Sequence, residues 1–377
     1  MRYERIDTEL FVENRKRFVK GIVPQSVAIF NSNDIMPTNA DGTMRFRQNN
    51  DLFYLTGADQ EETILLLAPD ASDETHREIL FVKETNETIA VWEGEKLTME
   101  QAREVSGIQT IFWLKDFDRV FGKVVSESAH IYLNSNEHSR ADITVETRDA
   151  RFLKWCKEKY PLHKYRRSAP ILNQIRAIKS KMEILLMQEA CNITEKGFRR
   201  LLKSTKPGVW EYELEAELIH EFIRNRADGF AYEPIIASGP NACVLHYISN
   251  SGQCKKGDLL LLDIGAEYAN YDSDLSRTIP VSGTFDKRQK AVYNAVLRVQ
   301  NAAIDMLRPG TLIKEYHEEV GLLMQDELLK LKLITKTDIK NQDPKWPAYK
   351  KYFMHGTSHF LGLDTHDVGN FDLPMEA

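Results

Sequence analysis

The segment Leu259–Pro280 reads LLLLDIGAEYANYDSDLSRTIP, and it constrains the fold more than any other part of the chain. Four consecutive leucines lead directly into Asp263, which indicates a buried strand that ends on an acid. A turn-like stretch follows, and then a second strand-like run. A hairpin centred between Tyr268 and Ala269 would place Asp263 directly opposite Asp274. Opposed residues on paired strands have Cβ atoms about 4.5–5.5 Å apart.

Two carboxylates this close beside an apolar strand repel each other unless one is protonated or a cation lies between them. A divalent metal ion is the simplest compensation, and acid–base catalysis is the alternative. Two solvated turn acids are a third interpretation, which the adjacent leucine run makes less favourable. The hairpin therefore predicts a metal or acid–base site and leaves the choice open.

A second candidate cluster is FMHGTSHFLGLDTHDVG at Phe353–Gly369. It contains His355, His359 and His366, three of the ten histidines of the chain. The glycines of this segment favour strand and loop over helix. A third piece, AYEPIIASGPNACVLHY, contains a turn followed by His246, which by itself is weak evidence for a site.

Composition indicates a globular protein of two or three domains. The chain has 377 residues, of which 42% are hydrophobic and 28% charged, and a domain takes roughly 150 residues. The net charge of −6 gives no basic face for nucleic acid. No signal peptide or membrane span is recognisable, and none of the four cysteines forms a C-x-x-C pair. We therefore expect a cytoplasmic protein with free thiols and with no nucleic-acid or membrane partner.

Strand-like and helix-like runs alternate over roughly the first 150 residues, which predicts an α/β layer domain. The run 88–92 is one of the expected strands. The basic, proline-ended stretch Lys164–Pro170 is the best boundary, so we expect domains at 1–170 and 171–377. A long amphipathic helix is expected over 175–202.

Together these segments resemble the pita-bread metallopeptidases, and specifically aminopeptidase P (Xaa-Pro aminopeptidase) and its relative prolidase. The resemblance covers roughly residues 170–377 and implies an α+β pita-bread catalytic domain. The preceding residues, most recognisably RFRQNNDLFYLTG, are similar to the creatinase-like N-terminal α/β domain of that family. Methionine aminopeptidase usually lacks such a domain and is therefore disfavoured.

The resemblance implies a centre of two divalent metal ions, usually manganese, with Asp263, Asp274 and His359 as ligands. The ligand set of the family is two Asp, one His and two Glu, which suits a hard-to-borderline ion. In the family pattern the two glutamates lie beyond Ala377. The catalytic domain is therefore expected to be incomplete at its C-terminus, and the chain as written is expected to be weakly active or inactive.

The same resemblance assigns His246 and His366 to catalysis, handling substrate and proton transfer, and His355 to substrate binding. It implies peptides with proline at the second position as substrates, cleaved by a metal-activated hydroxide. Trp92 resembles a tryptophan that the family places near the active site of a neighbouring subunit, and a homo-oligomer, dimer or tetramer, is implied. Prolidase is the alternative activity, and a non-catalytic peptide-binding protein is the alternative from another class.

Overall fold

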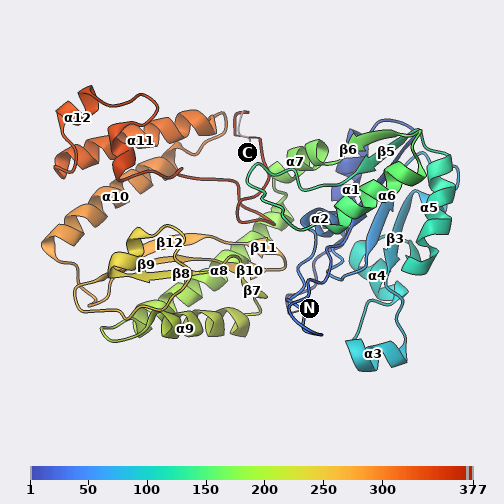
Figure 1. The fold of residues 1–377 in the computed structure, drawn as a ribbon, viewed down its shortest axis with the longest axis horizontal. Coiled ribbons are helices and arrows are strands. Elements are labelled where there is room, and N and C mark those ends of the chain that lie inside the picture. Colours follow the sequence, from blue (N-terminus) through green and yellow to red (C-terminus); the bar gives the residue numbers. More distant parts are fainter. Residues whose placement is uncertain (1, 371–372, 376–377) are drawn as a thin grey trace. The chain divides into compact units, whose positions relative to one another are not determined.

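The computed structural model describes residues 2–370 and 373–375, and the chain divides into two compact units (Figure 1). One unit is Arg5–Arg176, and the other combines Met1–Glu4 with Ala177–Ala377. Each unit has a hydrophobic core of its own. Within the part of the chain that the structure describes, every helix is too short or too polar to cross a membrane.

The Arg5–Arg176 unit is built on a six-stranded sheet with the order β4-β3-β2-β1-β5-β6. The central strand β1 pairs antiparallel with β2 and parallel with β5, and all six of its residues are buried. A strand buried on both faces is typical of a sheet inside an α/β layer domain, and the predicted fold class of this region is confirmed. The strands are β1 (Ser26–Asn31), β2 (Ile64–Leu67), β3 (Glu78–Val82), β4 (Thr110–Trp113), β5 (His130–Leu133) and β6 (Lys164–Arg167).

Seven helices of this unit surround or flank the sheet (Figure 1). Aromatic side chains of two of them, α5 and α6, pack together over the core of the unit. The helices are α1 (Glu9–Gly21), α2 (Asn50–Thr56), α3 (Glu87–Glu93), α4 (Met99–Ser106), α5 (Phe117–Ser126), α6 (Arg148–Lys159) and α7 (Ala169–Ala177).

The strand expected at 88–92 is wrong, because this run forms helix α3. The side chain of Asn86 accepts a hydrogen bond from the backbone N–H of Ile89, which caps the N-terminus of the helix. Gly94, at φ 78°, follows the last helical residue and donates its N–H to the carbonyl of Ala90. None of the α3 side chains is buried. The β-branched residues of this run therefore gain no stabilisation from packing in a sheet, and the two helix caps determine the local structure.

The second unit holds two three-stranded sheets, β12-β9-β8 and β11-β10-β7, and longer helices. Its strands are β7 (Gly229–Phe230), β8 (Ile235–Ser238), β9 (Leu259–Ile264), β10 (Ala266–Tyr268), β11 (Tyr271–Asp272) and β12 (Leu275–Pro280). Its helices are α8 (Lys181–Ser204), α9 (Glu211–Arg224), α10 (Lys287–Met306), α11 (Ile313–Lys330) and α12 (Lys336–Lys340), with short 3₁₀ turns at η3 (Gly239–Cys243) and η4 (Ala348–Lys351).

The single helix expected over 175–202 is interrupted. Helix α7 ends at Ala177, and α8 begins after Ser180. The Ser180 hydroxyl accepts from the Glu183 backbone N–H, and the Glu183 carboxylate accepts from the Ser180 N–H at 2.8 Å. This capping box starts a new helix. The apolar residues keep their helical spacing across the interruption, so the sequence pattern does not reveal that there are two helices.

Helices α10 and α11 pack on each other through a small apolar core, and the buried Glu327 of α11 lies at its edge. The Glu327 carboxylate pairs with Arg298 of α10 and, at 2.8 Å, with Lys330. These two hydrogen-bonded cations lower the pKa of Glu327 to about 2. A carboxylate with a lowered pKa stabilises the folded state above its unfolded pKa, and this contribution is lost as the pH falls toward 2.

We predict that Glu327→Gln lowers the free energy of unfolding near neutral pH by about 1 kcal/mol, because the half-exposed Arg298 is screened by water. The difference from the parent protein should shrink as the pH falls from about 4.5 toward 2. Urea unfolding at neutral and acid pH measures it. Glu318→Gln, which changes an exposed acid of the same helix, is the matched control and should have little effect. If Glu327→Gln lowers the free energy of unfolding by the same amount at every pH, the ion-pair explanation is contradicted.

Candidate active site

Asp263 and Asp274 lie on the two arms of one hairpin, as predicted, but in a different register. Asp263 is paired with Ser276, so the direct pairing with Asp274 is wrong by two residues. The chain reverses at Ala269 and Asn270, which both have positive φ (54° and 64°). Two such residues make the primed turn that suits hairpins. Because side chains alternate with a period of two, a two-residue shift keeps both acids on one face.

The Tyr232 hydroxyl lies between the two acids. Its oxygen is 2.8 Å from Asp263 Oδ1 and 3.0 Å from Asp274 Oδ1, so the phenol O–H donates to this carboxylate pair. Burial, followed by the two carboxylates, raises the pKa of Tyr232, and the phenol stays protonated. Sequence analysis missed this residue, because it precedes β8 and no spacing in the sequence links it to the hairpin.

The two acids have pKa values that move in opposite directions. Burial, with a further contribution from the charge of Asp274, raises the pKa of Asp263. Asp274 is also desolvated by burial, but hydrogen bonds from His359 and Tyr232 outweigh this, and its pKa is lowered. Such a divergence is expected where two carboxylates lie close together and share one donor, Tyr232, while only Asp274 has a second donor, His359.

His359 completes the cluster. Its Nδ1 lies 2.8 Å from the backbone carbonyl of Phe360, and its Nε2 lies 3.1 Å from Asp274 Oδ2. The hydrogen bond that Asp274 accepts therefore requires a proton on Nε2 as well as on Nδ1, because neutral imidazole with its proton on Nδ1 presents only a lone pair at Nε2. Two acceptors facing each other require a proton or a cation between them. Metal-ligating histidines commonly hydrogen-bond through their other ring nitrogen in this manner.

The residues present fit a divalent ion in kind, because two carboxylates and an oriented imidazole are ligands of hard-to-borderline metals. Within the described residues, however, no group of three or more His, Cys, Asp or Glu side chains is already arranged around a vacant ion position. His359 and Asp274 contact each other directly.

Of the other predicted histidines, His366 joins the cluster and two do not. The His366 ring centroid lies 4.3 Å from that of His359, with the planes at 72°. His246, on the segment after η3, and His355 are both exposed. In the part of the chain that the structure describes, neither makes a hydrogen bond to Asp263, Asp274 or His359.

The segment that carries His246 is anchored to a fully buried acid, Glu211, the first residue of α9. Its carboxylate accepts hydrogen bonds from both sides of the segment, which lower its pKa against the effect of burial. The donors are Ser238 N–H (2.7 Å), Ser238 Oγ (2.8 Å), Asn241 Nδ2 (3.1 Å), Tyr247 OH (2.7 Å) and Gly252 N–H (2.6 Å).

We predict that Glu211→Gln lowers the free energy of unfolding by about 2–3 kcal/mol, because the amide turns an acceptor into a donor among buried donors. It should also speed amide hydrogen exchange across residues 239–252. Denaturant unfolding and exchange followed by mass spectrometry measure the two effects. Glu217→Gln on the same helix, whose carboxylate pairs with the half-exposed Arg200, is the control. Unchanged exchange in the Glu211 variant would show that the carboxylate does not anchor the segment.

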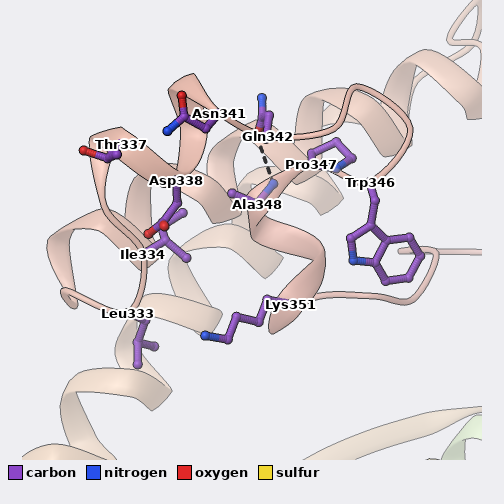
Figure 2. Close-up of a pocket in the computed structure, with 10 residues that line it drawn as sticks. All are labelled: Leu333, Ile334, Thr337, Asp338, Asn341, Gln342, Trp346, Pro347, Ala348 and Lys351. Atoms are coloured by element: carbon purple, nitrogen blue, oxygen red, sulfur yellow. Dashed lines mark hydrogen bonds between the residues drawn. The ribbon is translucent and has the colours of Figure 1, made fainter.

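A pocket of about 460 Å³ lies elsewhere in this unit, between α12 and η4 (Figure 2). The Gln342 side chain accepts from the Ala348 N–H at 2.9 Å across its wall, and Trp346 lies on its rim. None of the predicted site residues lines it. The chemistry-bearing cluster and this pocket are therefore separate features.

Two carboxylates on a hairpin and an imidazole beside them are ligand types of metal-dependent enzymes, and a separate α/β unit accompanies them. Residues 185–375 match the family model of metallopeptidase family M24, and residues 11–132 match that of the aminopeptidase P N-terminal domain. The chain belongs to metallopeptidase family M24, the pita-bread family, and its N-terminal unit is of the aminopeptidase P type. Both parts of the expected fold class are thereby confirmed.

Individual relatives extend along almost the whole chain. Xaa-Pro aminopeptidase of Haemophilus influenzae is 33% identical over 370 residues, which is 97% of this chain and 82% of the relative. The Escherichia coli Xaa-Pro aminopeptidase is 32% identical over 369 residues, with the same coverage. An aminopeptidase P structure from Bacillus anthracis superposes with a TM-score of 0.90 at 31% identity, covering 98% of this chain and 86% of that one. Zinc-substituted E. coli aminopeptidase P in complex with product gives a TM-score of 0.86 at 31% identity, covering 99% and 85%.

Proposed function

We propose that the protein is a metal-dependent aminopeptidase that removes the N-terminal residue from peptides with proline at the second position. The observation that carries the proposal is the convergence of Asp263 and Asp274 on one phenol oxygen, with His359 against Asp274. The names of the H. influenzae and E. coli relatives support the Xaa-Pro specificity.

In this proposal Asp263, Asp274 and His359 hold the metal, and we infer a pair of manganese ions. When bound, such ions polarise the peptide carbonyl and make a water-derived nucleophile available at neutral pH. Tyr232 stays protonated and holds the two carboxylates on one side of the hairpin. His366, in ring contact with His359, is placed to hold or move a proton, because the ordinary pKa of histidine lies near neutrality.

His246 and His355, which lie apart from the cluster, have proposed roles in substrate handling. His246 would contact the substrate and take part in proton transfer, and the buried Glu211 network supports this by fixing the segment on both sides of it. His355 would bind the substrate. The Xaa-Pro bond suits a dedicated enzyme, because it is a tertiary amide without the N–H that many peptidases use.

The direct test incubates the protein with Mn²⁺ and an Xaa-Pro-Xaa tripeptide and follows release of the N-terminal residue by chromatography. We expect at most weak release, which stops on chelation and requires proline at the second position. Release from a matched alanine-containing peptide at the same rate would contradict the specificity. A strong preference for the Xaa-Pro dipeptide would favour prolidase, and peptide binding without cleavage would favour a non-catalytic peptide-binding protein.

We also propose that the protein works in the cytoplasm as a homo-oligomer. The four cysteines are free thiols, which suits a reducing compartment. Val91 and Trp92 on α3, a helix that projects from its unit (Figure 1), are 81% and 85% exposed, and a partner subunit would cover such side chains. Light scattering on the purified protein, compared with Trp92→Ser, tests the assembly, and a monomeric parent protein would contradict it.

A further inference from the structure

A pocket of about 310 Å³ lies in the Arg5–Arg176 unit at the carboxyl end of the central strand β1. It is lined by Asn31, the last residue of β1, and by Ile64, its partner on β2. Two helices begin at the pocket, since Phe117 is the first residue of α5 and Arg148 the first of α6. Ligands of open α/β sheets bind outside the carboxyl ends of the strands, so this position is one where a ligand is expected.

Arg148 lines the pocket without a direct ion pair, although the charges of Asp34, Glu62 and Asp149 act on it from a greater distance. Its guanidinium donates to the Ser32 hydroxyl at 2.8 Å, and across the described residues no carboxylate lies within ion-pairing distance of it. The adjacent Asp149 instead accepts from the Asn31 amide at 2.8 Å. Burial lowers the pKa of Arg148, although an arginine remains charged at any ordinary pH. A desolvated guanidinium without a carboxylate is costly, and a ligand carboxylate would satisfy it.

Arg151 lies one turn further along α6 and lines the same pocket, and its charge is neutralised by a direct ion pair. Its guanidinium bonds both oxygens of Asp34, at 2.8 and 2.9 Å. The two arginines line the same cavity and differ in whether a protein carboxylate is provided. Asp34 bonds Arg151 and acts on Arg148 only through its charge, so the hydrogen-bonding positions of the Arg148 guanidinium beyond Ser32 remain available to a ligand carboxylate.

The two helix N-termini contribute partial positive charge, which one acid in the first turn of each helix, Asp118 on α5 and Asp149 on α6, partly offsets. The N-terminus of a helix carries a partial positive charge that favours anions. The N-terminus of α6 is capped only by Thr147, which accepts from the Ala150 N–H. At α5 the Asp116 side chain makes no capping hydrogen bond, because it pairs with Arg119 instead. One acid, Asp118, lines the pocket, and it is exposed at the rim.

The remaining wall is aromatic. The ring centroids of Phe117 and Phe152 are 5.8 Å apart, and those of Phe152 and Trp155 are 5.3 Å apart. Phe152 and Trp155 are half-buried, so part of each side chain remains accessible. Aromatic surfaces at such spacings accept a further ring by stacked or edge-on contact.

We propose that this pocket binds a small aromatic carboxylate, with its carboxylate on Arg148 and its ring against Phe117, Phe152 and Trp155. The volume of about 310 Å³ is at the lower end of the range for ligand sites, roughly 300–1,000 Å³, and suits one ring with a short acidic chain. Plain aromatic acids and free aromatic amino acids share this chemistry. The site is independent of the proposed peptidase activity, because every lining residue belongs to the other unit.

The test is a calorimetric titration of the metal-free protein with 3-phenylpropionate, L-phenylalanine and 2-phenylethylamine. We expect the two carboxylates to bind and the amine, which has the ring alone, to fail. Stronger binding of phenylalanine than of phenylpropionate would identify an amino acid, with its ammonium on Asp118. Arg148→Met should weaken binding by about tenfold or more, which is about 1.4 kcal/mol. Arg103→Met, which changes a helical arginine outside the pocket, should bind as the parent does.

A second measurement does not depend on the variant folding. A crystal of the parent protein soaked with 3-(4-bromophenyl)propionate should show an anomalous bromine peak beside Trp155, with the carboxylate on Arg148. The proposal is overturned if neither 3-phenylpropionate nor L-phenylalanine binds, or if 2-phenylethylamine binds equally well. A bromine peak at another position would also overturn it. Parent-like affinity in a folded Arg148→Met protein would do the same.

Discussion

Asp263→Asn is expected to abolish metal-dependent peptidase activity while making the metal-free protein more stable. The two effects have one physical origin. The half-buried Asp263 and Asp274, whose side chain is 27% exposed, approach the same phenol oxygen, and without an ion their charges repel. The asparagine side chain keeps an oxygen that accepts from Tyr232, so the change removes charge and preserves shape. We expect a gain of about 1 kcal/mol in the metal-free state.

The loss of activity should be far larger. A metal ion contributes several kcal/mol of transition-state stabilisation, and losing about 4 kcal/mol lowers a rate by about 10³-fold. Thermal unfolding with and without Mn²⁺ provides a readout separate from turnover. The melting temperature of the parent should rise with Mn²⁺, because binding to the folded state alone stabilises it, and that of Asp263→Asn should not. The exposed-acid variant Glu318→Gln should behave as the parent does in both measurements.

A metal-free Asp263→Asn protein less stable than the parent would show that the carboxylate pair is not repulsive. A variant that keeps the Mn²⁺-induced rise would remove Asp263 from the ligand set. Either result would leave the family membership intact, because this rests on the whole chain and not on one residue.

The sequence predicted that Asp263, Asp274 and His359 come together, but it did not predict their geometry. A leucine run ending in Asp263, followed by Asp274, was enough to place two acids on one hairpin face, because that conclusion depends only on a period of two. The register depended on which residues adopt positive φ. Ala269 is one of them, and alanine gives no signal for a left-handed turn. The error of two residues follows from that single conformation.

Contacts between segments that are distant in the sequence could not be predicted, for a different reason. Tyr232 reaches Asp263 from 31 residues earlier in the chain, and Glu211 reaches Gly252 across 41. Neither partner follows from local periodicity, since each is selected by the packing of the whole unit. Helix α3 shows the opposite case, in which local caps override a β-rich composition because nothing is buried. The capping residues Asn86 and Gly94 can be recognised in the sequence, but the strand prediction gave more weight to the β preference of the residues between them.

Gly265→Ala is expected to disrupt the fold and the site together. Gly265 lies between β9 and β10, two residues after Asp263, and a Cβ atom there would be 1.9 Å from the backbone oxygen of Ser273. No contact of that length is possible, and the atom in the way is main chain, which cannot rotate aside. Because Ser273 directly precedes Asp274, relieving the clash pushes one acid of the pair away from the other.

We predict that Gly265→Ala costs roughly 4 kcal/mol or more in unfolding free energy, the range of severe overpacking, and abolishes the Mn²⁺-induced rise in melting temperature. Gly122→Ala on α5 is the control, because its nearest neighbour would be 3.9 Å away. Alanine in a helix should raise stability there by about 0.5–1 kcal/mol. A Gly265→Ala protein with parent-like stability would mean that the strands carrying the two acids can separate freely. Parent-like metal binding would then show that the close approach at Gly265 does not set the spacing of the acids.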